Sequence, residues 1–204
     1  MSSVSSQISA PLTARSVHLC VDMQKLFAAG SEWHAPWLER VLPAVERIAA
    51  AKPAQTIFTR FIPPRQPDEA TGLWRSYYER WRSMTLDSLP PDKVELLPSL
   101  AHLAPPAEVL DKTVYSPWYD GKLAARLRER KPDAVVITGT ETDVCVLAAV
   151  LGAVDDGYRV VVPADAICSS SDDGHDALLG LFHNRFSQQV EVVPTAEELL
   201  RNWS

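Results

Sequence analysis

Three residues in this chain have the side chains that nucleophilic attack on a carbonyl group requires: Asp22, Lys112 and Cys145. A thiol is only a few per cent thiolate at neutral pH, so a nucleophilic cysteine needs a nearby base or positive charge. A carboxylate could take the thiol proton and later deliver it to a leaving amine, and an ammonium group could stabilise the anion. Together, the three residue types indicate cysteine-dependent acyl transfer.

The segment around Cys145 is expected to place the thiol at the mouth of a helix. Residues 135–150 begin as an apolar, β-branched run, turn at Gly139, and resume with the apolar spacing of a helix. Thr142 is expected to be the N-cap, which makes Cys145 the third helical residue, close to unpaired backbone N–H groups and the positive end of the helix dipole. Such N–H groups could also stabilise an oxyanion.

Each of these residues also has an ordinary structural interpretation. A cysteine after a strand often packs in the core, an aspartate at a strand end often caps a helix, and a single lysine is usually at the surface. His175 offers a different chemistry, because it could form a Cys–His dyad with Cys145. Only the convergence of Asp22, Lys112 and Cys145 on one site would favour the catalytic interpretation.

The elements that would position these residues alternate along the chain. Helical segments are expected near 35–51, 121–130, 143–156, 172–183 and 195–202. Apolar runs without strict alternation are typical of parallel strands that are buried on both faces. The expected strands are Val17–Val21, Thr56–Phe61, Glu108–Leu110, Ala134–Thr138, Arg159–Val162 and Gln189–Val193. This pattern predicts one α/β domain over residues 16–204, a three-layer α/β/α sandwich, preceded by a flexible tail over residues 1–15.

In such sheets, ligands bind outside the carboxyl ends of the strands, where the strand order reverses. Asp22 follows the first expected strand, Lys112 the third and Cys145 the fourth. We therefore expect all three side chains on one edge of the sheet.

Composition narrows the function further. The chain of 204 residues has a net charge of −6, which argues against nucleic-acid or polybasic membrane binding. No apolar run approaches the roughly 20 residues of a membrane span, and the N-terminus lacks the apolar region of a signal peptide. The three cysteines lack metal-type spacing. We expect a cytoplasmic protein with reduced thiols and a small-molecule substrate.

Three motifs resemble those of the isochorismatase-like cysteine hydrolases, which include nicotinamidases and N-carbamoylsarcosine amidohydrolases. They are Val21-Asp22-Met23-Gln24 with Phe27 close behind, Asp111-Lys112 followed by Ser116-Pro117-Trp118, and Gly139-Thr140-Glu141-Thr142-Asp143-Val144-Cys145-Val146. The resemblance extends from about Val17 to Val193, and the first and third motifs are specific in combination.

The resemblance implies a catalytic triad of Asp22, Lys112 and Cys145 as proton shuttle, electrostatic support and nucleophile. It also implies a cis peptide between Thr140 and Glu141, with the backbone N–H groups of Glu141 and Cys145 as the oxyanion hole. The family's sheet has six parallel strands in the order 3-2-1-4-5-6. Relatives commonly form dimers or tetramers, so we expect a homo-oligomer.

Departures from the family pattern indicate the reaction. Nicotinamidases carry an Asp-x-His motif and a further histidine as metal ligands after the second strand, whereas this chain has Thr59-Arg60-Phe61-Ile62-Pro63-Pro64 there. We therefore expect no metal and no cofactor. Relatives that cleave the vinyl ether of isochorismate can lack the cysteine, so its presence favours cleavage of a C–N bond in a small amide, carbamoyl or ureido compound. A vinyl-ether hydrolase and a non-catalytic binding module on the same fold are the alternatives.

The candidate substrate pocket consists of Phe27, Arg60, Trp118 and Glu141. Glu141 is unusual beside a nucleophile, and its carboxylate could pair with Arg60, bind the substrate, or turn into a salt bridge within a loop. A further set of aromatic residues has the spacing i, i+3, i+4 and i+7 of one helical face and could be core, subunit interface or lid: Trp74, Tyr77, Tyr78 and Trp81.

Overall fold

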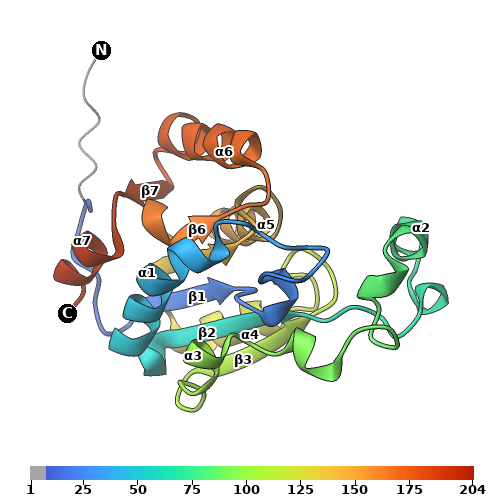
Figure 1. Cartoon of the computed structure of the whole chain (residues 1–204). Helices are drawn as coiled ribbons and strands as arrows, with labels where there is room; N and C mark the ends of the chain where they lie inside the picture. Colours follow the sequence, from blue (N-terminus) through green and yellow to red (C-terminus); the bar gives the residue numbers. More distant parts are fainter. Residues whose placement is uncertain (1–7) are drawn as a thin grey trace.

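The computed structural model describes residues 8–204, which form a parallel sheet covered by helices on both faces (Figure 1). The strands pair in the order β3-β2-β1-β4-β5-β7, and the short β6 pairs with the end of β4. Their bounds are β1 Val17–Val21, β2 Thr56–Phe61, β3 Glu108–Lys112, β4 Val135–Thr140, β5 Val160–Pro163, β6 Ile167–Cys168 and β7 Val190–Val193.

Seven helices connect or follow these strands in the described chain. Their bounds are α1 Leu38–Ala51, α2 Leu73–Arg80, α3 Pro98–Ala101, α4 Lys122–Arg130, α5 Leu147–Asp155, α6 Asp172–Asn184 and α7 Ala196–Arg201. Side chains of α1, α3 and α7 pack on one face of the sheet, and those of α4, α5 and α6 pack on the other.

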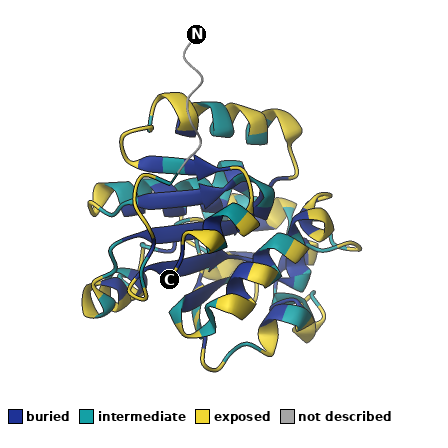
Figure 2. Cartoon of the chain, turned by 90° about the vertical axis from the view of Figure 1, so that its left-hand side faces the viewer, coloured by how far each residue is buried: buried dark blue, intermediate teal, exposed yellow. Residues whose placement is uncertain are grey.

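Burial explains why the strand sequences are almost continuously apolar. Every residue of β1, β4 and β5 is buried, and successive residues of a strand face opposite layers. Leu19, for example, belongs to the core under α4–α6, whereas Cys20 belongs to the core under α1. Figure 2 shows the buried sheet between helices whose outer faces are exposed.

The fold confirms the predicted α/β sandwich and the order of its six main strands. Two local features differ from the sequence-based expectation. The two-residue β6 adds a seventh strand, and the helix expected from residue 143 begins with a wide turn over residues 142–146 before α5. In this turn, the N–H group of Val146 donates to the carbonyl of Glu141, five residues back, at 3.0 Å.

The expected flexible tail over residues 1–15 differs from the structure in its second half. Leu12 is fully buried and pairs with Trp203, and the Thr13 hydroxyl donates to Asp133 at 2.6 Å. The first contact holds this segment against the end of the chain and removes the apolar surface of Leu12 from water, and the second holds it against the residues that precede β4. Residues 1–7 lie outside the described part.

A long connecting segment joins β2 to β3 and contains α2. In Figure 1 it extends beyond the end of β1, on the side where the carboxyl ends of the central strands lie. No helix among residues 8–204 combines the length and the apolar character that crossing a membrane would need.

Candidate active site

Strand register brings the carboxyl ends of the central strands together. Val21, the last residue of β1, pairs with Gly139 of β4, and Phe61, the last residue of β2, pairs with Lys112 of β3. Asp22 therefore lies beside the end of β4, while β2 separates it from β3. The Lys112 side chain crosses this gap, with its Nζ 4.9 Å from the centre of the Phe61 ring.

The side chains of Asp22, Lys112 and Cys145 meet in a buried cluster. Lys112 Nζ lies 2.7 Å from Asp22 Oδ2 and 3.3 Å from Cys145 Sγ, and it also donates to the carbonyl of Val114 at 3.1 Å. The Asp22 side chain is fully buried, that of Lys112 is 5% exposed, and Cys145 is 5% exposed. The ammonium group thus compensates two potential anions that water does not solvate.

Thr59 holds Asp22 in place. Its hydroxyl donates to Asp22 Oδ1 at 2.6 Å, and the backbone N–H of Asp22 donates to the carbonyl of Thr59 at 3.2 Å. Asp22 has a φ of 52°, a left-handed conformation that aspartate tolerates better than most residues. The first carboxylate oxygen is therefore bound by Thr59, and the second faces Lys112.

The electrostatics of the cluster protonate the resting thiol. Burial raises the pKa of Cys145 well above its usual range, the charge of Asp22 raises it further, and Lys112 opposes both effects only in part. Burial would lower the pKa of Lys112, but the charge of Asp22, and that of Cys145 whenever its thiol ionises, raise it above its ordinary value. Lys112 thus lowers the thiol pKa, in the direction expected from the sequence, while burial and Asp22 act in the opposite direction.

The segment that leads to Cys145 is shaped by close backbone packing. Gly139 has a φ of 113°, and a Cβ atom there would collide with the backbone of Val21. The peptide bond between Thr140 and Glu141 is cis. Thr142 does not cap the following helix with its side chain, because its hydroxyl instead makes a 2.8 Å hydrogen bond with His175 Nδ1.

The hydrogen bond with Thr142 also determines the position of His175, the alternative partner of Cys145. This residue bonds to Thr142, and the described partner of the Cys145 sulfur is Lys112, so the alternative Cys–His dyad is not formed.

Glu141 and Arg60 do not pair with each other. The Glu141 carboxylate accepts a hydrogen bond from the Ser170 backbone N–H at 3.0 Å. The Arg60 guanidinium binds Asp111 at 2.7 Å and Glu95 at 2.6 Å. Both side chains thus have local partners, so the suggested Arg60–Glu141 pair is wrong.

Trp118 and Phe27 lie in different environments. The Trp118 indole N–H donates to the carbonyl of Ala149 at 3.0 Å, and its ring lies where a Cβ on Gly152 would be. Trp118 therefore packs along α5, beyond the turn that carries Cys145. Phe27 is 6% exposed and stacks on Trp33 with ring centroids 6.4 Å apart.

Trp33 connects the body of the protein to the aromatic face of α2. Its ring lies 5.9 Å from Phe61, 6.0 Å from Tyr77, 6.4 Å from Tyr78 and 6.3 Å from Trp81. Tyr115, in the loop after Lys112, contacts Trp74 of α2 at 4.8 Å. We call Trp33, Tyr77, Tyr78 and Tyr115 the aromatic wall. Of the four aromatic residues predicted to share one helical face, only Tyr78 is buried, at 1% exposure, whereas Trp74, Tyr77 and Trp81 are partly exposed.

Three residues of this site did not emerge from the sequence: Thr59, Trp33 and Tyr115. Thr59 lies in a strand where alternation indicates only burial, and Trp33 lies in an irregular segment without periodicity. Of the three, Tyr115 could have been predicted from the sequence, because it lies between Lys112 and Trp118 in the second motif.

Among residues 8–204, no three His, Cys, Asp or Glu side chains come together as a metal ion would require. At the carboxyl end of β2, where the nicotinamidase pattern places metal ligands, Thr59 binds Asp22 and Arg60 is paired with Asp111. The donor set at this position therefore does not fit a metal ion.

The parallel sheet and the buried Asp–Lys–Cys cluster at its carboxyl edge define an isochorismatase-like α/β protein. The chain matches the family model described as "Isochorismatase domain" over residues 16–197. It belongs to the isochorismatase family.

Solved structures agree with this assignment. A cysteine hydrolase from Pseudomonas syringae pv. phaseolicola 1448A is 26% identical, with a TM-score of 0.76 over 96% of this chain and 98% of that chain. An N-carbamoylsarcosine amidase from Thermoplasma acidophilum is 21% identical, with a TM-score of 0.69 over 87% of this chain and 95% of that chain. The latter likeness shows the fold alone.

Sequence similarity to curated proteins is more local. The isochorismatase family protein PncA of Bacillus subtilis (strain 168) is 36% identical over 81 residues, which are 40% of this chain and 44% of that protein. The match thus spans less than half the length of this relative.

Proposed function

We propose that the protein is a metal-independent cysteine hydrolase that cleaves the C–N bond of a small amide, carbamoyl or ureido compound. The observation that carries the proposal is the position of Lys112 Nζ, 2.7 Å from Asp22 Oδ2 and 3.3 Å from Cys145 Sγ inside a buried site. A carboxylate, an ammonium and a thiol in contact supply the base, the counter-charge and the nucleophile of an acyl transfer.

In the first half-reaction, Asp22 accepts the thiol proton as Cys145 Sγ attacks the substrate carbonyl carbon. The carbonyl oxygen becomes an oxyanion, which the backbone N–H groups of Glu141 and Cys145 stabilise. The C–N bond then breaks, and Asp22 returns its proton to the leaving nitrogen. The products of this step are a free amine or ammonia and a thioester on Cys145.

In the second half-reaction, Asp22 takes a proton from water, whose oxygen attacks the thioester carbonyl. The C–S bond breaks, and the thiolate regains a proton from Asp22. Lys112 stays positively charged throughout, because Asp22 and Cys145 raise its pKa. It balances the negative charge while that charge moves between the carboxylate and the sulfur.

The test is release of ammonia or amine from a panel of small amides, carbamoyl compounds and ureido compounds. Cys145→Ser and Asp22→Asn should each abolish turnover, whereas Cys168→Ser, a change at a buried cysteine of β6, should leave turnover unchanged. Acylated Cys145 should be trapped by rapid quenching and detected by mass spectrometry.

Two outcomes would favour the alternatives. Hydrolysis of isochorismate that survives Cys145→Ala would assign the site to vinyl-ether cleavage. Saturable binding of panel compounds without any turnover would make the chain a binding module.

A further inference from the structure

The turn that carries Cys145 is tied to residues 169–175, which connect β6 to the first turn of α6. Each of the three consecutive residues 141–143 makes a side-chain hydrogen bond to this segment. The bonds join Glu141 to the Ser170 N–H at 3.0 Å, Thr142 to His175 Nδ1 at 2.8 Å, and Asp143 to the Ser169 hydroxyl. The residues that lead to the nucleophile are therefore all held by one segment.

The contact between the turn and this segment is close and largely buried. Thr142 is fully buried, and Ser169 is 4% exposed. A Cβ atom on Gly174 would collide with Asp143 Oδ2, so a glycine leaves the room that this carboxylate occupies. Because a buried polar group that loses its hydrogen-bond partner is costly, these side chains have little freedom to move.

Residues 169–175 are in turn fixed to the body of the protein. The Ser171 hydroxyl caps α6 by accepting from the Gly174 N–H at 3.0 Å, and the Ser169 hydroxyl accepts from the Ser171 N–H at 3.2 Å. The helix α6 packs onto the sheet through Phe182, which is fully buried. The segment is therefore a support whose own position does not depend on the turn that it holds.

The backbone of the turn makes its shape sensitive to this support. The Glu141 carbonyl accepts from the N–H groups of Val144, at 3.1 Å, and Val146, at 3.0 Å, which lie on either side of Cys145. Such wide turns are rare and frequently occur at functional sites. Cys145 Sγ lies 3.3 Å from Lys112 Nζ, so a shift of residues 141–143 would change this contact.

We propose that residues 169–175 position the nucleophile, with His175 holding the start of the turn. Through Thr142, His175 keeps the Cys145 thiol beside Lys112 and orients the backbone N–H groups that face the oxyanion in the proposed reaction. His175 is thus a positioning residue, which acts through Thr142 rather than on the substrate. The proposal rests on the proposed hydrolase function.

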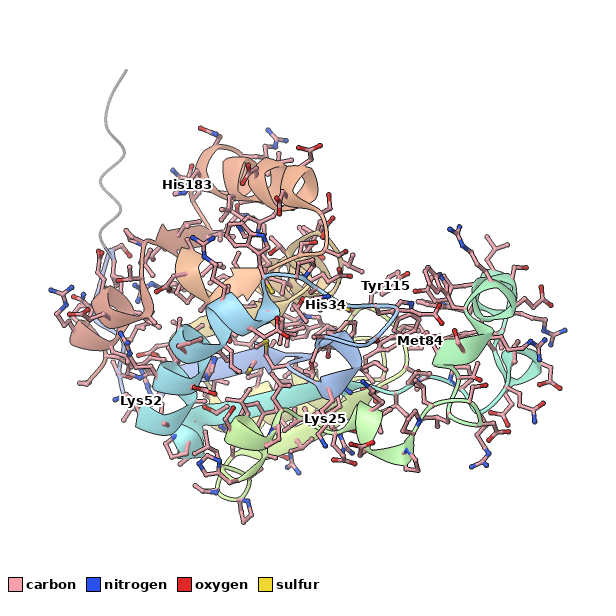
Figure 3. The ribbon with its side chains drawn as sticks, in the orientation of Figure 1. Lys25, His34, Lys52, Met84, Tyr115 and His183 are labelled. Carbon is pink, nitrogen blue, oxygen red and sulfur yellow. The ribbon has the colours of Figure 1, made fainter. Side chains whose placement is uncertain are left out.

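The His175 side chain can be replaced without overpacking its surroundings. It borders a hollow of about 120 Å³, whose lining also includes Trp37. His175→Leu removes the hydrogen bond to Thr142, whereas His175→Asn keeps a donor and an acceptor near the position of Nδ1. His183→Leu is the matched control, because His183 is exposed near the other end of α6 (Figure 3).

The first measurement is steady-state hydrolysis of an amide that the unaltered chain cleaves. His175→Leu should lower kcat roughly 10- to 100-fold and change KM less than about threefold, because a misplaced nucleophile slows the chemical step while the substrate still binds. His175→Asn should recover most of kcat, and His183→Leu should leave it unchanged. A loss that His175→Asn does not recover would assign His175 to packing and overturn the proposal.

A second variant moves Asp143 without removing a polar group. In Gly174→Ala, the added Cβ atom would collide with Asp143 Oδ2, so the carboxylate that binds Ser169 must shift. Gly180→Ala makes the same substitution in the same helix, where a Cβ atom meets nothing within 4 Å. Gly174→Ala should lower kcat, and Gly180→Ala should leave it unchanged. Equal kcat values in the two variants would overturn the positioning role of the segment.

Alkylation of the cysteines tests positioning without a substrate. Burial is the largest cause that raises the pKa of Cys145, so a turn released by His175→Leu should expose the thiol and lower that pKa. A decrease of half a unit to one unit increases the thiolate roughly 3- to 10-fold, and labelling by iodoacetamide at pH 8 should accelerate equally. Cys20 in β1 is the internal control, because it is fully buried with a pKa raised to about 12.

The outcomes separate this proposal from the hydrolase. Faster labelling of Cys145 in His175→Leu, reversed in His175→Asn and with Cys20 unchanged, supports positioning. If the same chain hydrolyses no amide, only the hydrolase is contradicted. Unchanged labelling of Cys145 or unchanged kcat in His175→Leu overturns the positioning role and leaves the hydrolase. Equal acceleration at Cys20 and Cys145 would indicate general unfolding and also overturn it.

Discussion

Asp22 influences the pKa of the Cys145 thiol, so replacing its carboxylate with a neutral amide should change the reactivity of that thiol. Because the charge of Asp22 adds to burial in raising the pKa of Cys145, a neutral residue in its place should lower that pKa. Lys112 would then pair with the sulfur alone. In the proposed mechanism the carboxylate is also the base that accepts the thiol proton, so the reactivity of the thiol and the rate of turnover should change in opposite directions.

We therefore predict that Asp22→Asn speeds alkylation of Cys145 by a small reagent between pH 7 and 9, while amide turnover falls by roughly 10²- to 10⁴-fold. Peptide mass spectrometry after timed labelling measures the rates. Cys168 is the internal control, because burial raises its pKa to about 12 and Asp22 is not among the causes. Equal or slower labelling of Cys145 in the variant would contradict the electrostatic argument.

Thr59 acts through Asp22 rather than on the substrate. Thr59→Val keeps the shape of the side chain but removes the 2.6 Å hydrogen bond to Asp22 Oδ1. A hydrogen bond to a charged group contributes about 1.5–3 kcal/mol, so kcat should fall roughly 10- to 100-fold with KM little changed.

Thr13→Val is the matched control, since its hydroxyl donates to the Asp133 carboxylate, also at 2.6 Å, away from the site. It should affect stability without lowering kcat. Equal kcat values in the two variants would contradict a role for Thr59 in positioning Asp22.

At the scale of elements, the contact between the ends of β1 and β4 requires a glycine. Gly139→Ala would place a Cβ atom against the Val21 backbone at a φ of 113°. We expect a loss of more than about 1 kcal/mol in the free energy of unfolding, together with reduced turnover, because Asp22 and Glu141 each lie within two residues of the displaced pair. Chemical denaturation and amide hydrolysis measure the two effects.

Gly180→Ala in α6 is the control for Gly139→Ala, because it adds a Cβ atom where there is open space. A Cβ atom there meets nothing within 4 Å, so the change should leave stability unchanged or raise it by up to about 1 kcal/mol. Similar destabilisation by both variants would show that the close approach of β1 and β4 is not the cause.

At the scale of the whole molecule, a neutral histidine in the sheet makes stability depend on pH. His18 in β1 is fully buried, and it makes hydrogen bonds with Thr56 at 3.1 Å and Thr138 at 2.8 Å. Burial lowers its pKa to about 3. In the unfolded chain the ring takes up a proton near pH 6.5, so the unfolded state binds more protons between these values.

Stability should consequently fall as pH decreases from 6.5 towards 3, with about 3 kcal/mol lost from this group by pH 4. Urea denaturation at a series of pH values measures the slope, and an NMR titration of the ring measures its pKa directly. His18→Gln should flatten the slope above pH 5, whereas His183→Gln, an exposed change on α6, should not. A ring that titrates near 6.5 in the folded chain would disprove the prediction.

The sequence determined the sheet and the meeting of Asp22, Lys112 and Cys145 at one edge. The apolar runs of the buried strands and the order of the three motifs were sufficient, because parallel strands with helical crossovers put their carboxyl ends on the same side. The strand order came from the family resemblance, and the computed pairing agrees with it. The catalytic roles of the three residues remain predictions.

The tertiary structure alone decided which neighbours these residues have. Thr59 meets Asp22 across 37 positions of sequence, Trp33 joins α2 to Phe61, and Glu141 turns to Ser170 instead of Arg60. Local patterns report burial and periodicity, but they do not say which side chain meets which across the sheet edge. Burial by the surrounding fold also decided that the resting thiol is protonated, because desolvation outweighs the nearby ammonium in setting its pKa.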